Sequence, residues 1–274
     1  MPELPEVESI CQGLRSNILN CNILSAKALT NLKLRQIIPE ELPEKIINSK
    51  IIKIDRRAKY IQVFLDNDII IIIHLGMSGK VLIKADDYIF QKHDHFMIGL
   101  DNNLKIIYND PRRFGLITYT YKNNISSFSL FKSLAPEPLE SEFTVSYLQN
   151  ILKKSSKPIK LLLMDNSKVV GVGNIYAAES LFLSKISPER LSNTLTLDEI
   201  KLLHINIIKV LQQSIKAGGS TLKDYALING EKGFFQNSFK VYAKEGKKCM
   251  ICKNIIIKIK QAGRASFYCA QCQK

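Results

Sequence analysis

Residues 60–74 have the sequence YIQVFLDNDIIIIIH, in which a polar Asp-Asn-Asp turn separates two apolar runs. Short runs rich in β-branched and aromatic residues, bounded by turn formers, are typical of antiparallel strands. Runs of the same kind follow at residues 81–84, 96–100, 104–108 and 116–120. The stretch from about residue 51 to 121 therefore predicts an antiparallel β-sandwich.

A helix is predicted directly behind the N-terminus, where apolar residues recur every three or four positions and so share one face. These residues are Val7, Ile10, Cys11, Leu14 and Ile18. The helix would hold Pro2 and Glu3 in place. Pro2 is small enough for Met1 normally to be removed, which would expose a secondary amine. An α-amino group titrates near pH 8, so at neutral pH it keeps more of the nucleophilic neutral form than a lysine does. The alternative is a charged leader in solvent.

Helical patterns dominate after a proline-rich linker with the sequence SLAPEP at residues 133–138. Thr196 and Glu199 form a predicted capping box at the start of a long amphipathic helix. Gly218 and Gly219 are expected to end that helix. Another helix is expected to begin within GVGNIY at residues 171–176, and a glycine-rich turn at a helix start can present backbone N–H groups to an anion.

Four cysteines form two CxxC pairs, a spacing typical of zinc sites. They are Cys249, Cys252, Cys269 and Cys272. Four thiolates would close the coordination sphere of one Zn²⁺, so the metal is expected to be structural. Between the pairs, residues 255–259 and 265–268 predict two strands with a turn at 261–264, which places Arg264 at or beside the tip of a zinc-stapled β-hairpin. Disulfide pairing is the alternative.

Charge favours a polyanionic partner. The 274 residues include 39 Lys or Arg and 25 Asp or Glu, a formal net charge of +14. From residue 239 onward there are nine Lys or Arg and one acid, Glu245. Such an excess indicates nucleic acid rather than a membrane, because the longest apolar run, residues 69–73, is far too short to span a bilayer. The N-terminus lacks the pattern of a signal peptide. The expectation is a cytoplasmic protein with reduced thiols.

Two turns carry further candidates. HLGMSG at residues 74–79 contains His74 and Met77, and DPRRFG at residues 110–115 contains Arg112 and Phe114. Arginines bind phosphate and an aromatic side chain on a turn can wedge between bases. Packing roles for the same side chains are the alternative.

Together these motifs resemble the bacterial formamidopyrimidine-DNA glycosylases, which remove oxidised purines from DNA. The resemblance covers the whole chain and rests on motifs that occur in order. They are MPELPEVE (1–8), RRAKY (56–60), HLGMSG (74–79), KHDHF (92–96), NDPRRFG (109–115), VVGVGNIYAAES (169–180), GGSTLKDY (218–225) and GRASFYCAQCQK (263–274).

The resemblance implies an α+β fold with an N-terminal β-sandwich, a helix-two-turns-helix domain and a zinc finger. The expected domains are a catalytic domain at 1–133, a linker at 134–144, a helix-two-turns-helix DNA-binding domain with a lesion loop at 145–238, and a four-cysteine zinc finger at 239–274. The expected partner is double-stranded DNA that contains oxidised bases, bound by a monomer.

The resemblance also implies roles for individual residues. Pro2, freed of Met1, would be the nucleophile that forms a Schiff base; Glu3 would protonate the sugar, with Glu6 as a supporting acid. Lys59 would serve the elimination steps that follow. The resemblance implies that Met77, Arg112 and Phe114 fill the void left by the extruded base. It implies phosphate contacts by Lys59, His74, Asn174, Tyr176 and Arg264, and a role of Lys160 in handling 8-oxoguanine. The implied contacts in the lesion loop are Thr221, Lys223 and Tyr225.

Two other functions stay open at this point. An endonuclease VIII-like glycosylase shares the Pro-Glu start but prefers oxidised pyrimidines. A zinc-dependent DNA-binding protein without catalysis would share the basic hairpin. The Met77, Arg112 and Phe114 set and the GGSTLKDY segment favour the enzyme for oxidised purines.

Overall fold

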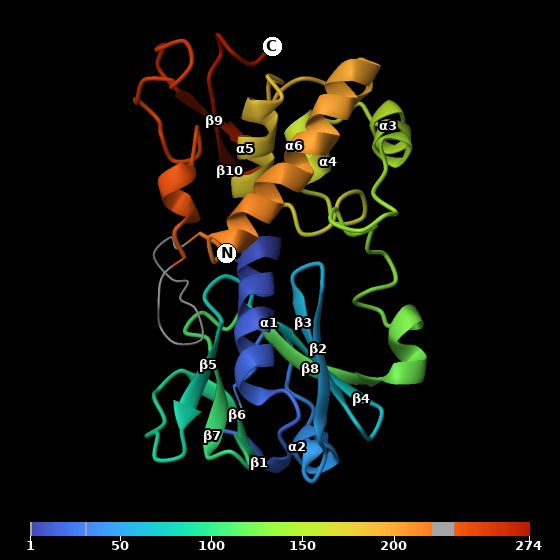
Figure 1. Ribbon diagram of the computed structural model, residues 1–274, viewed down its shortest axis with the longest axis vertical. Coiled ribbons are helices and arrows are strands. Elements are labelled where there is room, and N and C mark those ends of the chain that lie inside the picture. The colour runs from blue at the N-terminus through green and yellow to red at the C-terminus, as the bar shows by residue number, and fades with distance from the viewer. Residues whose placement is uncertain (1, 31, 221–232) are drawn as a thin grey trace. The chain divides into compact units, whose positions relative to one another are not determined.

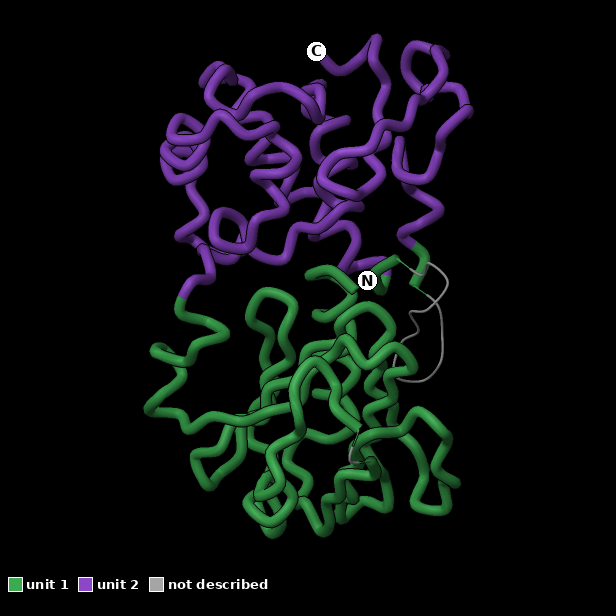
Figure 2. The backbone as a smooth tube through the Cα atoms, turned by 180° about the vertical axis from the view of Figure 1, so that it is seen from behind, with its two compact units in different colours: residues 1–132, 218–234 green, residues 133–217, 235–274 purple. Residues whose placement is uncertain are grey.

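The computed structural model describes residues 2–30, 32–220 and 233–274. The chain forms two compact units, coloured separately in Figure 2. Unit 1 comprises Met1–Lys132 and Gly218–Phe234, and unit 2 comprises Ser133–Ala217 and Phe235–Lys274. The described residues on either side of the predicted lesion loop, 218–220 and 233–234, belong to unit 1. The predicted contacts Thr221, Lys223 and Tyr225, and also Met1, lie outside the described residues.

Unit 1 contains two four-stranded sheets in which all strand pairs are antiparallel (Figure 1). The first has the order β1 (Ile23–Ala28), β6 (Asp94–Leu100), β7 (Leu104–Asn109), β5 (Lys80–Ala85). The second has the order β2 (Ile51–Arg57), β3 (Tyr60–Leu65), β4 (Ile69–His74), β8 (Leu116–Tyr121). Apolar residues of both sheets form one buried core, so the predicted sandwich is confirmed. Strand β1 was not predicted.

The isoleucine run of β4 explains its central place in the second sheet. Ile71 and Ile73 belong to the shared core, while Ile70 and Ile72 point to the opposite face and are buried as well. A strand with both faces covered loses the polar alternation of a half-exposed strand. Unit 1 also contains α2 (Leu42–Ile46) and the 3₁₀ helix η1 (Lys122–Ser127).

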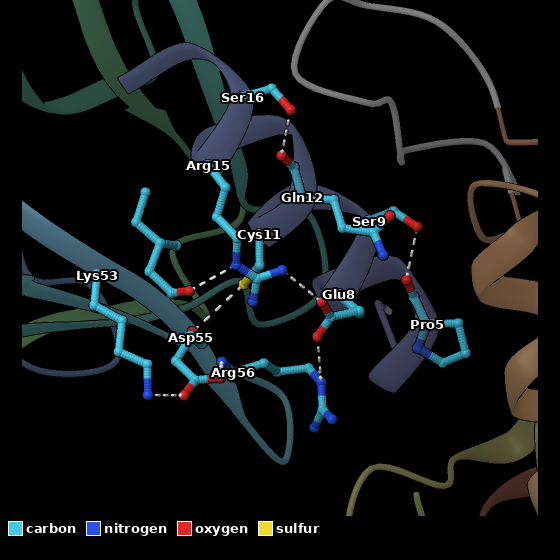
Figure 3. Close-up of polar contacts among 11 residues, drawn as sticks. Pro5, Glu8, Ser9, Cys11, Gln12, Arg15, Ser16, Lys53, Asp55 and Arg56 are labelled. Atoms are coloured by element: carbon cyan, nitrogen blue, oxygen red, sulfur yellow. Dashed lines mark hydrogen bonds and ion pairs between the residues drawn. The ribbon is translucent and has the colours of Figure 1, made fainter. Parts of the chain in front are cut away.

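The leading helix α1 (Leu4–Ile18) packs its predicted apolar face into the sandwich core. Polar residues of α1 form hydrogen bonds and ion pairs with β2, as Figure 3 shows. Arg15 donates from Nε to the Ile54 carbonyl at 2.7 Å and pairs with Glu8 at 2.8 Å. Glu8 also accepts from Arg56 Nε at 3.1 Å. The N-terminal end of the chain is therefore anchored to the sheet at several points.

Unit 2 is helical and ends in a small hairpin. Its elements are α3 (Val145–Lys153), α4 (Ile159–Leu163), α5 (Asn174–Leu183), η2 (Ser192–Thr194), α6 (Leu197–Lys216), η3 (Phe235–Ser238), β9 (Ile257–Gln261) and β10 (Arg264–Tyr268). The capping box of Thr196 and Glu199 begins α6 as predicted. None of the helices among the described residues has the length and apolar character needed to cross a membrane.

The hairpin turns through Ala262 and Gly263, both with positive φ, and Arg264 pairs with Gln261 across the ladder. Strand β9 begins at Ile257, two residues later than predicted. The reason is that Ile255 and Ile256 bond backward to Lys248 and Lys247, so they belong to the cysteine-bearing loop rather than to the hairpin.

Candidate active site and nucleic-acid interface

Pro2 and Glu3 are buried at the start of α1. Glu3 is the N-cap residue, and its side chain accepts from the backbone of Glu6. In return the Glu3 N–H donates to Glu6 Oε2 at 2.9 Å. This reciprocal capping box satisfies two helix-end donors and fixes the direction in which the chain enters the helix. The N-terminal proline is therefore held by a rigid element.

Glu6 connects this end of the helix to the Gly218–Phe234 segment of unit 1. Its Oε1 accepts from Ser220 N at 2.7 Å and from Ser220 Oγ at 2.9 Å. Gly219 has φ +80°, and a Cβ added there would lie 3.2 Å from Glu6 atoms. The expectation had given Glu6 only a supporting acid role. The contact with Ser220 joins residues 214 positions apart, which no local pattern could have revealed.

Lys59 and His74 lie close enough together for their charges to interact. Lys59 follows Ala58 in the tight turn between β2 and β3, where Ala58 has φ 53°. Burial, together with the cations Arg35 and Lys59, lowers the pKa of His74 to about 4. The imidazole is thus neutral at pH 7. Because His74 Nδ1 accepts from Gly76 N at 3.0 Å, its Nε2 carries the proton and is the atom able to donate to an anion.

The predicted void-filling residues are exposed on two adjacent turns of unit 1. Met77 is 39% exposed and Phe114 is 50% exposed. The Arg112 guanidinium lies 5.0 Å from the centre of the Phe114 ring, which is a cation–π distance. Large apolar groups that stay exposed on well-ordered turns are available to a partner rather than used in the core.

In unit 2, residues of the α5 start and the hairpin converge on one carbonyl. Asn174, the first residue of α5, donates from Nδ2 to the Ala265 oxygen at 3.0 Å. Lys160 donates to the same oxygen at 3.0 Å and to Ser266 Oγ at 2.5 Å. Asn174 Oδ1 is buried and has no hydrogen-bond partner among the described residues. Arg264, directly before Ala265, is exposed.

Two predicted DNA contacts have buried side chains. Lys160 is 1% exposed, and its ammonium is used within unit 2. Tyr176 is fully buried, and its hydroxyl shares a hydrogen bond of 2.6 Å with Ser214. Any contact of Tyr176 with a phosphate would therefore come from its backbone in the first turn of α5.

The zinc-finger segment is joined to α5 by Glu179, which the sequence analysis did not identify. Its carboxylate accepts from three consecutive backbone N–H groups, those of residues 240–242, at 2.7 to 3.0 Å. Burial raises the pKa of Glu179. Gln273 adds a second link, since it accepts from Cys269 N and donates to the Ile186 carbonyl, each at 2.9 Å.

The four predicted zinc ligands come together at the base of the hairpin. Their Sγ atoms all lie within 4.8 Å of one another. The Cys249–Cys272 pair is 3.9 Å apart and the Cys252–Cys269 pair 3.4 Å apart. A tetrahedral zinc thiolate site with bonds of about 2.3 Å has edges of about 3.8 Å. The four cysteines thus fit a single structural Zn²⁺, and four sulfur ligands leave no position for a reactive water.

The buried Pro2 and Glu3 at the start of α1, the exposed Met77 and Phe114 and the four-cysteine hairpin together indicate a DNA glycosylase with a zinc finger. Three family models match the chain. They are the formamidopyrimidine-DNA glycosylase N-terminal domain at residues 1–117, the H2TH domain of that enzyme at 134–226, and the zinc finger found in FPG and IleRS at 246–274. The chain belongs to the formamidopyrimidine-DNA glycosylase family.

Relatives support this assignment over the full chain. The formamidopyrimidine-DNA glycosylase of Zymomonas mobilis is 45% identical over 274 residues, with 100% of both chains covered. That of Wolbachia pipientis is 46% identical over 273 residues, again covering 100% of both. Among solved structures, a Lactococcus lactis Fpg in complex with abasic-site DNA matches with a TM-score of 0.93 and 37% identity over 99% of each chain. A variant of Lactococcus lactis Fpg in complex with Fapy-dG DNA matches with a TM-score of 0.93 and 37% identity over 100% of each chain.

Proposed function

We propose that this protein excises oxidised purines, such as 8-oxoguanine and formamidopyrimidines, from double-stranded DNA and then cleaves the abasic site through a Schiff base on Pro2. The observation that carries the proposal is the burial of Pro2 and Glu3 at the anchored start of α1. The anchored helix start would hold the Pro2 nitrogen, once freed of Met1, in one position from which it can attack carbon.

The chemistry requires an amine, an acid and a cation. The Pro2 nitrogen attacks C1′ of the damaged nucleoside, the C1′–base bond breaks, and the base leaves with the bonding electrons and the proton that the Pro2 amine loses. Glu3 gives a proton to the ring oxygen as the sugar opens, which leaves an iminium between Pro2 and C1′. Loss of a proton from C2′ then expels the 3′ phosphate, and a second elimination expels the 5′ phosphate. Lys59, in the turn after β2, is the cation proposed to assist these departures.

The remaining residues are proposed to bind the duplex. A base that leaves the stack opens a gap, and the exposed Met77, Arg112 and Phe114 are proposed to fill it. The Nε2–H of His74, Asn174 at the start of α5 and the exposed Arg264 are proposed phosphate contacts. Because Lys160 is buried, its proposed contribution is to hold the Ala265 carbonyl and hence Arg264. The proposed place of action is the nucleoid in a bacterial cytoplasm.

Borohydride trapping tests the nucleophile. An abasic oligonucleotide should form a covalent adduct that peptide mapping locates on Pro2, in protein whose Met1 has been removed. Pro2→Gly should lose most of this adduct, and Pro43→Ala in α2 should keep it. An adduct that survives Pro2→Gly unchanged, or none in the unaltered protein, would exclude this nucleophile and favour a DNA-binding protein without catalysis.

Glu3→Gln separates base removal from later steps. Glutamine can still accept the helix-cap hydrogen bond but cannot supply the proton, so excision of an oxidised base should fall by roughly 10²- to 10⁴-fold. Trapping on a preformed abasic site should persist, because its cyclic hemiacetal opens spontaneously to the aldehyde that forms the imine. Glu44→Gln in the first turn of α2 is the matched control. Equal losses in both assays would refute the assigned acid role.

Substrate choice is tested by comparing excision of 8-oxoguanine opposite cytosine with excision of thymine glycol. A strong preference for 8-oxoguanine is expected. The opposite preference would favour the endonuclease VIII-like alternative.

A further inference from the structure

The buried carboxylate of Asp110 lies beneath the two turns that carry the proposed wedge residues. Asp110 is 0% exposed. Its Oδ1 accepts from Ser78 Oγ at 2.6 Å and from Arg112 N at 3.3 Å. Its Oδ2 accepts from Gly115 N at 2.8 Å and from the Tyr108 hydroxyl at 3.4 Å. One side chain thus connects the Met77 turn to the turn of Arg112 and Phe114.

All four of these partners are neutral donors. A buried carboxylate is costly unless hydrogen bonds replace its water, so the surrounding donors have little freedom to move away. Burial and the adjacent Asp110 raise the pKa of Tyr108, which keeps the phenol protonated and able to donate. Ser78 also accepts from Arg112 N at 3.2 Å, which closes a ring of contacts between the two turns.

The two turns touch at the level of their backbones. Gly76 has φ +59°, and a Cβ added there would lie 2.4 Å from the Phe114 carbonyl carbon. A Cβ on Gly115 would lie 1.6 Å from the Tyr108 hydroxyl and 2.6 Å from the His74 oxygen. No side chain fits at either position. The turns can therefore approach this closely only because both positions are glycine.

The main chain of Asp110 is held as well. Its N–H donates to the His93 carbonyl at 3.0 Å, and its carbonyl contacts His95 Nε2 at 2.9 Å. The Arg113 N–H donates to the Asp110 carbonyl at 3.2 Å. Arg113 adopts a left-handed backbone conformation in this turn, with φ 56°. The side chains of Met77 and Phe114, in contrast, are exposed and gain little from packing. Their position must come from the layer beneath them.

We infer that Asp110 is a positioning residue that holds the Met77 turn and the Arg112–Phe114 turn as one rigid platform before DNA arrives. The inference rests on the proposed function, which assigns these three side chains to the gap left by an extruded base. A platform formed in advance lowers the ordering cost of inserting them together, so its loss should slow reactions that need insertion. The reaction of Pro2 with single-stranded DNA, which has no opposite strand to contact, should be unaffected.

The experiment compares Asp110→Asn and Ser78→Ala in the zinc-loaded, full-length protein, with Asp87→Asn as the matched control. Asp87 is exposed in the turn after β5. Three quantities are measured: kcat/KM for 8-oxoguanine excision from duplex DNA, borohydride trapping on single-stranded abasic DNA, and the fluorescence of 2-aminopurine beside an abasic-site analogue in a duplex. The fluorescence rises when an inserted side chain removes the stacking of that base.

Asp110→Asn should lower duplex kcat/KM by about 10- to 100-fold and Ser78→Ala by about 3- to 10-fold, because the first weakens all four hydrogen bonds to the carboxylate and the second removes one of them. Both should reduce the fluorescence rise and leave single-strand trapping intact. Wild-type rates in the duplex assay for both variants, or equal losses in all three assays, would overturn the inference. If Asp110→Asn fails to fold, Ser78→Ala decides alone. Failure of the unaltered protein to excise or to trap would instead refute the proposed function.

Discussion

The sandwich turn of Arg112 and the zinc hairpin of Arg264 each present an exposed arginine, but different forces hold them. Beneath Arg112 lie the sandwich core and the Asp110 carboxylate. The hairpin has little core of its own, since all residues of β9 and three of the five residues of β10 are exposed or partly exposed. It depends on its cysteines, on Lys160 and Gln273, and on packing of Cys249 and Cys269 against Phe182 of α5.

This difference shows how a short segment can place a side chain accurately. A large sheet supplies rigidity through many apolar contacts, and one buried polar group then fixes the turn. A segment of about 30 residues cannot bury enough surface, so a metal and side chains from neighbouring helices take over that role. The two arginines should therefore respond differently to loss of metal, to mutation and to pH.

Removal of zinc should have the largest effect on folding and DNA binding, and it should distinguish the zinc hairpin from the sandwich most clearly. Structural zinc contributes about 10–16 kcal/mol in small zinc domains, so a chelator or Cys252→Ser should unfold the hairpin and abolish DNA binding. Hydrogen exchange should rise in residues 257–268 and at the packed side of α5, while β3 and β4 stay protected. Cys21→Ser is the control. Protection of the hairpin without metal would contradict this account.

Lys160→Met should loosen the hairpin next most strongly. The substitution keeps the length of the side chain but removes the ammonium that binds the Ala265 carbonyl and Ser266, at a cost of about 3 kcal/mol. Faster exchange in β10 and weaker DNA binding are expected, with the zinc content unchanged. Lys157→Met, at an exposed position just before α4, is the control. If Lys160 contacts DNA directly, binding will weaken without any change in exchange.

The stability of unit 1 should fall in acid because of His74. The folded protein keeps this imidazole neutral down to about pH 4, whereas the unfolded chain takes up a proton near pH 6.5. The unfolded state therefore binds more protons between these values, and the free energy of unfolding should decrease by about 2–3 kcal/mol as the pH falls from 6.5 to 4. Urea denaturation across this pH range should show that the free energy of unfolding of His74→Gln decreases less steeply than that of the unaltered protein. An identical slope would contradict the assignment.

Arg264→Ala should give the smallest change. Loss of one phosphate contact should lower the slope of log K against log salt by about one unit and leave the fold intact. Titration by fluorescence anisotropy at several salt concentrations measures the slope. Lys153→Ala at the end of α3 serves as the control. An unchanged slope would show that the exposed guanidinium does not meet a phosphate.

Much of the fold follows from local sequence patterns. Runs such as residues 69–74 predicted strands, and Thr196 with Glu199 predicted where α6 begins. Strand β1 was missed because only Ile23 is fully buried, and its other residues lack the alternation that marks a strand. The start of β9 was placed two residues early because an isoleucine run does not reveal that its first members bond to the preceding loop.

The candidate site was predictable where spacing alone defines the chemistry. Two CxxC pairs specify a zinc site, and a proline at the second position precedes a predictable helix. Residues whose roles depend on distant partners were not found this way. The DPRRFG motif contains Asp110 and the predicted helix after Gly173 contains Glu179, but neither pattern predicts a role for them. The reason is that the donors bound by these two carboxylates come from other parts of the chain.

The sequence by itself determined most strands of the sandwich, the starts of α1 and α6 and the metal ligands, since each depends on neighbours along the chain. Only the tertiary structure decided which polar groups are buried and what they hold. It buried Lys160 with its ammonium on the Ala265 carbonyl of the hairpin, and it joined Glu6 to Ser220. Burial and long-range hydrogen bonds arise when strands and helices pack, and packing is a property of the whole chain.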